Sequence, residues 1–198
     1  MALTGSAFLA LWNDIADVRV HDQWHTLEHV PERVSVTGFH GARPSWSASM
    51  RPDFSNFLRA ICAVTTSHGT GIGGAIGCLC VPASVADPAL RDALAQAANL
   101  PRINAIHSGR RSEPALTVPF KAPPQQTAPA LDFDRVALIE GLDRTACARA
   151  LDVLRRELRL ETLADSCTSG VFDLALVFPG SDPSERLAHR RPEWTRDV

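Results

Sequence analysis

The sequence lacks several residues and patterns on which common enzyme classes depend. It contains no tyrosine, so no phenol can act as a catalytic acid or oxyanion donor, and its only lysine is Lys121. Schiff-base chemistry would depend on that one residue, which lies in a proline-rich stretch. No G-x-S-x-G pattern occurs, so the usual nucleophile elbow of serine hydrolases is absent.

Long apolar runs and an excess of charge are also missing. No apolar run reaches the roughly 18 residues that a transmembrane helix needs. The first residues carry no basic segment ahead of an apolar one, so we expect no signal peptide. The net charge of −2 gives no electrostatic attraction to nucleic acid. We therefore expect a soluble, cytoplasmic protein that binds neither nucleic acid nor membranes.

The cysteines form no recognisable framework. Their number, five, is odd, which favours reduced thiols in a cytoplasmic protein. Cys78 and Cys80 form a C-x-C pair, but no second pair or nearby histidine completes four zinc ligands. We expect no metal there.

What is present favours a packed globular fold, because 45% of the 198 residues are hydrophobic and 21% are charged. Apolar runs predict strands, and apolar residues at helical spacing predict helices. The first elements are a strand at 7–12, a helix at about 16–29, strands at about 39–47 and 56–66, a helix at 87–99 and a strand at 102–111. This order, βαββαβ, is that of the ferredoxin-like fold.

A proline-rich stretch at 119–130 predicts an extended linker, after which the pattern begins again. Beyond it are a predicted strand at 135–139, a helix from 143 to about 160, a weak strand pattern at 161–168 and a clear one at 171–178. We predict an α+β fold of tandem ferredoxin-like units that form an α+β barrel. The first unit is 1–118 and the second, truncated unit is 131–198.

A glycine-rich segment interrupts the first unit. Gly69, Gly71 and Gly74 satisfy G-x-G-x-x-G, but the dinucleotide fingerprint needs a helix directly after it. Here an apolar run at 78–81 follows instead. We therefore expect a flexible loop or an insertion at about 68–81.

The segment from Trp24 to Arg33 carries the strongest chemical pattern. His29 lies in the last turn before Pro31, beside Glu28 and within one turn of His25. A neighbouring carboxylate and the helix dipole both favour a protonated imidazole, which suits acid–base work near neutral pH. Glu28 and His29 are the candidate catalytic pair, and Trp24 and His25 are candidate substrate-binding residues.

This segment, with Leu11–Asp14 and Gly38–Phe39, resembles a group of bacterial dimeric α+β barrel proteins, the EthD-like and related ferredoxin-fold proteins. Their first helix carries W-h-x-x-E-H-x-P-E-R followed by P-G-F. The resemblance implies two ferredoxin-like sheets, from two chains or two halves of one, around a cavity. Relatives include isomerases, cyclases, cofactor-free monooxygenases and haem enzymes. Thr37 departs from the pattern, as does the glycine-rich segment, which leaves the substrate open.

Three other interpretations of the same histidines remain. His29 and Glu28 can simply tie the helix end to the sheet. His25 to His29 also reads H-x-x-E-H, a zinc-binding pattern, but Pro31 ends the helix at once and the resemblance explains the motif without metal. His107 or His68 could hold haem, although a single strand histidine is more often a satisfied core or surface residue.

The leading expectation is a cofactor-independent enzyme of small-molecule catabolism. His29, assisted by Glu28, would move a proton on an enolisable carboxylic or aromatic-derived metabolite, giving isomerisation, lactone opening or decarboxylation. Further candidate substrate-binding residues are Trp12, Asn13, Arg43 and His107, with Asn13 placed to polarise a carbonyl. Arg110 and Arg111 could, like Arg43, clamp a carboxylate. We expect a homodimer or an intrachain pseudo-dimer. A non-catalytic ligand-binding or assembly protein is the alternative of another class.

Overall fold

A computed structural model describes Leu3, Val30 and residues 5–12, 41–42, 45–46, 58–112, 133–160, 169–175 and 177–179. Its strands are β1 (Ala7–Trp12), β2 (Gly41–Ala42), β3 (Ser45–Trp46), β4 (Leu58–Gly69), β5 (Ala75–Val81), β6 (Ile103–Arg111), β7 (Arg135–Gly141), β8 (Gly170–Leu174) and β9 (Phe178–Pro179). Its helices are α3 (Asp87–Ala98) and α4 (Arg144–Glu157). Within the described part of the chain, no helix is long and apolar enough to cross a membrane.

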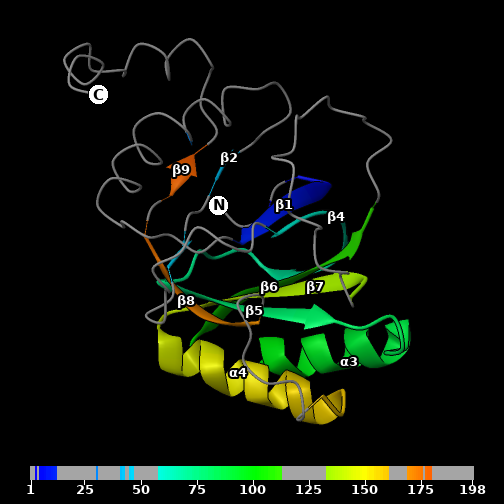
Figure 1. The fold of residues 1–198 in the computed structure, drawn as a ribbon. Helices are drawn as coiled ribbons and strands as arrows, with labels where there is room; N and C mark the ends of the chain where they lie inside the picture. Colours follow the sequence, from blue (N-terminus) through cyan, green and yellow to red (C-terminus); the bar gives the residue numbers. More distant parts are fainter. Residues whose placement is uncertain are drawn as a thin grey trace, which may run out of the picture.

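Seven strands form one antiparallel sheet in the order β1-β4-β6-β7-β5-β8-β3, and β2 pairs with β9 separately. The sheet curls into a half-barrel, with α3 and α4 both on one face (Figure 1). The run β5-α3-β6-β7-α4-β8 has the chain order βαββαβ, and its strands lie side by side in the order β6-β7-β5-β8. This confirms the predicted α+β class and the ferredoxin-like βαββαβ order. The observed run begins at β5, whereas the predicted one began at the strand 7–12.

Local sequence explains why the two helices form where they do. Pro88 lies in the first turn of α3, where a missing N–H costs nothing, and Asp87 adds a negative charge there. The side chain of Asp143 accepts a 2.8 Å hydrogen bond from the backbone N–H of Ala146 and so caps α4. Both helices were predicted, at 87–99 and at 143 to about 160.

The main hydrophobic core lies between these helices and the sheet. Leu94 of α3 and Leu154 of α4 are fully buried, as are Leu79 of β5, Ile106 of β6 and Ile139 of β7. Burying such side chains stabilises a fold by about 1.5–3 kcal/mol each. The sheet face under the helices is therefore the structural face.

The glycine-rich segment differs from the expected insertion. β4 continues to Gly69, and Ala75–Val81 form β5, which lies between β7 and β8 inside the sheet. A Cβ atom on Gly73 would come within 2.2 Å of the carbonyl oxygen of Gly141, and one on Gly77 within 3.3 Å of Ile139 and Leu151. The glycines here serve close packing against β7 and α4.

Several predictions fall on residues that the structure does not describe. The helix at 16–29, the linker at 119–130 and the strand at 161–168 lie outside the described residues, and the division into units 1–118 and 131–198 stays a prediction. The sheet does join strands from both sides of that linker, since β6 pairs with β7 from Ile103 opposite Gly141 to Arg110 opposite Arg135.

Candidate functional site

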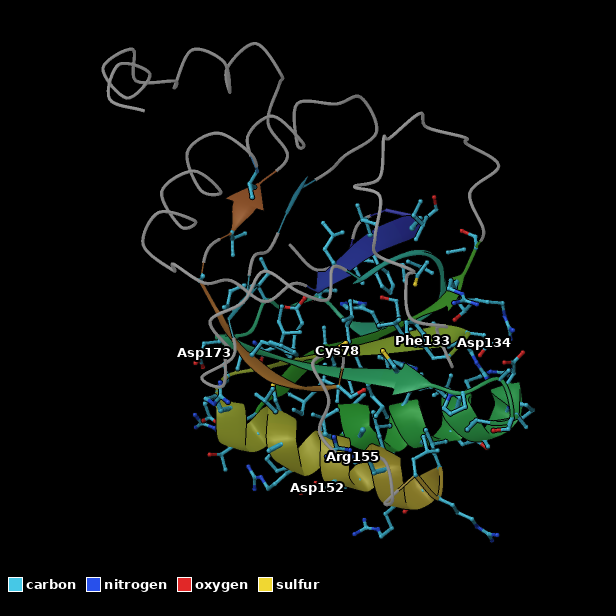
Figure 2. The ribbon with its side chains drawn as sticks, in the orientation of Figure 1. Cys78, Phe133, Asp134, Asp152, Arg155 and Asp173 are labelled. Carbon is cyan, nitrogen blue, oxygen red and sulfur yellow. The ribbon has the colours of Figure 1, made fainter. Side chains whose placement is uncertain are left out.

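The face of the sheet away from the helices carries polar and reactive side chains. Successive residues of a strand point to opposite faces. Ile106 and Ile139 pack under the helices, so His107 and Glu140, which follow them, point to the other face. Figure 2 shows Cys78 on this side of the sheet, and Asp152 and Arg155 on α4 on the other.

His107 is the centre of this candidate site. Its side chain is fully buried, and its Nε2 atom is shielded from solvent. Its Nδ1 atom lies 2.8 Å from the hydroxyl oxygen of Ser67 on β4, the residue directly opposite it in the sheet. The register of β4 shifts by one residue between Val64 and Thr66, which brings Ser67 onto the face of His107. The structure thus fixes the position of the imidazole, while its predicted substrate-binding role stays a prediction.

Glu140 of β7 is a second buried polar residue on this face, only 2% exposed. Its Oε2 atom accepts a 3.0 Å hydrogen bond from the backbone N–H of Gly73. Glu140 lies opposite Ala105, and Leu138 lies opposite His107, so Glu140 and His107 are diagonal neighbours. Residues in such diagonal pairs lie roughly 7–8 Å apart, within reach of long side chains. The sheet thus places an imidazole and a carboxylate on the same face, on adjacent strands.

The rest of this face is apolar and thiol-rich. A second cluster of buried residues consists of Ala60, Cys62, Cys78, Cys80, Phe133 and Val136, with Phe8, Ala10, Leu138 and Phe172 packed against it. None of the four described cysteines, three of them in this cluster, forms a disulfide. Burial raises the pKa of the Cys62 thiol to about 11, helped by Cys80 and opposed by Arg111. A thiol of such high pKa is a poor nucleophile at neutral pH.

The arginines near the strand ends divide into two groups. Arg110 forms ion pairs with Asp87 at 2.6 Å and with Asp134 at 2.7 Å. The buried Arg135 binds the same two carboxylates, so this network ties the start of α3 to β7. The Arg110 guanidinium is therefore already ion-paired with two carboxylates of the protein itself. Arg111 instead lies 5.8 Å from the centre of the Phe133 ring, a cation–π contact.

Most of the side chains singled out from the sequence lie outside the described residues. These are Asn13, Trp24, His25, Glu28, His29 and Arg43. Trp12 is the last residue of β1 and lies opposite Leu58, but the structure does not describe its side chain. Their proposed roles stay predictions. Among the residues that are described, no three His, Cys, Asp or Glu side chains come close enough to hold a metal ion.

Sequence reasoning missed Glu140 and Ser67. The signal for Glu140 was available, because it follows Val136 and Leu138 at alternate positions of one strand. If the strand lies in the middle of the sheet, a carboxylate at the end of that apolar series is expected to be buried. Ser67 could not be found, since its contact with His107 depends on the irregularity in β4.

Comparison with known proteins gives a fold and no family. No family model matches the sequence, and no curated protein matches it. An anthrone oxidase-like protein of known structure matches with a TM-score of 0.55 and 12% identity, over 89% of this chain and 94% of its own. A proposed monooxygenase from Fusobacterium nucleatum matches with a TM-score of 0.50 and 6% identity, over 91% of this chain and 97% of its own. At these identities the likeness is one of fold alone.

Proposed function

We propose that this protein is a small-molecule enzyme that removes a proton from an enolisable, aromatic-derived substrate and lets molecular oxygen react with the resulting enolate. The observation that carries the proposal is the fully buried His107, fixed by Ser67, on the face of the half-barrel that the helices leave free. Imidazole is the side chain whose ordinary pKa best suits proton transfer near neutral pH.

The surroundings of His107 support a proton-transfer role. The apolar cluster next to it offers ring surfaces, Phe8 and Phe172 among them, to a flat aromatic substrate. Glu140 brings a carboxylate to the same face, and a carboxylate beside an imidazole stabilises its protonated form. One residue then takes the proton while its neighbour compensates the charge.

The names of the two structural neighbours favour oxidative chemistry over the isomerisation, lactone opening or decarboxylation expected from the sequence. For an anthrone, the reaction balances without a further reductant. The C–H bond opposite the carbonyl breaks, the proton goes to His107, and the electron pair stays in the enolate. One oxygen molecule then adds to that carbon as a peroxide, the second C–H bond and the O–O bond break to give the anthraquinone, and the released hydroxide takes up one proton and leaves as water. The EthD-like affiliation suggested by the segment from Trp24 to Arg33 is part of this proposal.

The acid–base pair predicted at His29 and Glu28 is the competing assignment within the same function. Both assignments require an imidazole base, and they differ only in which histidine takes the proton. Variants of His29 and His107 therefore decide between them.

The experiment is oxidation of anthrone in air-saturated buffer, followed by oxygen uptake and by anthraquinone absorbance. We expect one oxygen consumed per anthraquinone formed, and a loss of about 10²–10⁴-fold in kcat for His107→Asn, the usual contribution of a general base. His68→Asn is the matched control, because His68 lies opposite Ile106 and so belongs to the helix-covered face. Full activity in His107→Asn with loss in His29→Asn would move the base to His29. Tight anthrone binding without turnover would instead indicate a ligand-binding protein.

A further inference from the structure

We propose that Ser67 is a positioning residue that fixes the tautomer of His107 and passes its proton to solvent. The inference rests on the proposed function, in which His107 is the base. It concerns the step that a buried base must complete after each proton abstraction, which is to release that proton before the next turnover.

The geometry provides such a route in one contact. His107 is 0% exposed, so its ring does not meet bulk water, whereas Ser67 is an exposed residue. The Ser67 hydroxyl lies 2.8 Å from Nδ1, a normal hydrogen-bond length for these atoms. One hydroxyl group therefore spans the distance between a buried imidazole and the surface.

The two ring nitrogens then have separate roles. When Nδ1–H donates to the Ser67 oxygen, Nε2 keeps its lone pair for the substrate proton. Once Nε2 is protonated, the Nδ1 proton moves to the Ser67 oxygen while the Ser67 hydroxyl proton moves to water. The net result is one proton transferred from substrate to solvent, with Ser67 restored as a hydroxyl. The departing oxygen then takes the Nε2 proton while Nδ1 regains a proton from solvent through Ser67, which restores the starting tautomer.

A neighbouring pair on the same two strands shows that a hydroxyl contact alone does not imply this role. The Thr65 hydroxyl lies 3.3 Å from the Ser108 hydroxyl, and 3.2 Å from the carbonyl oxygen of Ser108. That pair also bridges β4 and β6 but holds no titratable group. Thr65→Val removes a cross-strand hydroxyl contact without touching His107, and is the matched control.

The experiment compares Ser67→Thr with Ser67→Val. Threonine and valine have the same shape and both favour strands, but only threonine carries a hydroxyl group. The first readout is ¹⁵N NMR of the full-length protein, which reports the His107 tautomer and the exchange of its ring proton with water. We expect Ser67→Thr and Thr65→Val to match the wild type. Ser67→Val should change the tautomer balance and slow the exchange. This readout needs no substrate, so it decides the inference even if anthrone is not oxidised.

The second readout is turnover. We expect Ser67→Val to lower kcat by about 10²-fold with KM unchanged, at the lower end of general acid–base effects. Ser67→Thr should keep the wild-type rate. Unchanged ¹⁵N spectra and ring-proton exchange in Ser67→Val would overturn the inference. So would an equal change in Thr65→Val, which would indicate a structural effect of strand pairing.

Discussion

The two faces of one sheet differ sharply in this protein, although the same strands build both. In β6, Ile106 belongs to the core under the helices, while His107 next to it is buried on the free face beside Ser67. In β7, Ile139 and Glu140 repeat the arrangement. Both faces hold fully buried residues, so burial alone does not separate them. What separates them is the chemistry of the buried groups: hydrocarbon on one side, and on the other thiols, an imidazole and a carboxylate.

The comparison teaches that hydrocarbon and polar groups are assigned to alternate residues of the same strands. Each residue under the helices contributes hydrocarbon burial, which stabilises the fold in proportion to area. Each polar residue on the other face costs free energy to bury unless it is hydrogen-bonded. Ser67 and the Gly73 N–H supply such bonds to His107 and Glu140. Buried titratable groups of this kind mark a candidate functional site.

The largest expected change comes from truncating the structural face. Ile139→Ala should lower the free energy of unfolding by about 2–5 kcal/mol, because Ile139 of β7 is fully buried in the core between the sheet and the helices. The adjacent Leu138→Ala, on the free face and only partly buried, should cost roughly 1–2 kcal/mol. Urea unfolding monitored by circular dichroism measures both, with the slope checked for constancy. Equal losses would show that the two faces contribute alike to stability.

A smaller change is expected from adding a methyl group to the free face. A Cβ on Gly109 would lie 2.5 Å from a ring carbon of Phe8 and 2.7 Å from the Cβ of Cys62. Gly109→Ala should therefore destabilise by about 1–3 kcal/mol. Gly170→Ala, where no atom lies within 4 Å of the new Cβ, is the matched control and should cost little. A neutral Gly109→Ala would mean that this face is loosely packed, in contrast to the helix-covered face.

A pH-dependent change is expected at the cap of α4. The hydrogen bond from the Ala146 backbone, and then the Arg102 guanidinium, hold the pKa of Asp143 below its ordinary value of 3.8. A carboxylate with a lowered folded pKa stabilises the protein above the ordinary value, and that contribution is lost as pH falls through the folded value. The melting-temperature gap between wild type and Asp143→Ala should be constant near neutrality and shrink in acid. A gap independent of pH would exclude a charged cap.

The smallest effect on stability near neutral pH concerns the thiols of the free face. With a pKa of about 11, Cys62 is a thiolate in about one molecule in a thousand at pH 8. A maleimide followed by mass spectrometry should leave Cys62 unlabelled in the folded protein and label it in urea. Because the raised pKa favours the folded state only while the thiol is protonated, stability should decline as pH rises above the ordinary thiol value. Rapid labelling of Cys62 in the native protein would contradict the burial of this face.

The sequence predicted those elements that local patterns determine. Apolar residues at helical spacing predicted α3 at 87–99 and α4 from 143 to about 160. Apolar runs gave β1, β6 and β7, and β4 to within a few residues. β5 was mistaken for part of an insertion because glycine disfavours strands locally. In the folded chain, Gly77 is required by the approach of Ile139 and Leu151, which no local pattern reveals.

The site was less predictable than the fold. His107 was singled out, but nothing in its neighbours along the chain indicated the contact with Ser67, forty residues away. Glu140 was passed over because an acid at the end of an apolar run usually marks the end of a strand. Both contacts arise from strand pairing between distant segments, and pairing register depends on the whole sheet.

Thr65, the extra residue in β4, marks the position at which this strand can lose one residue without disturbing its pairing with β6. Val64 and Thr66 lie opposite consecutive residues of β6, Gly109 and Ser108, so Thr65 has no partner of its own in the ladder. A chain shorter by one residue here would keep every other pair, Ser67 with His107 included. Natural variants that carry a single-residue gap at this position are thus compatible with an intact imidazole site, whereas a gap two residues further along would move a different side chain against the ring.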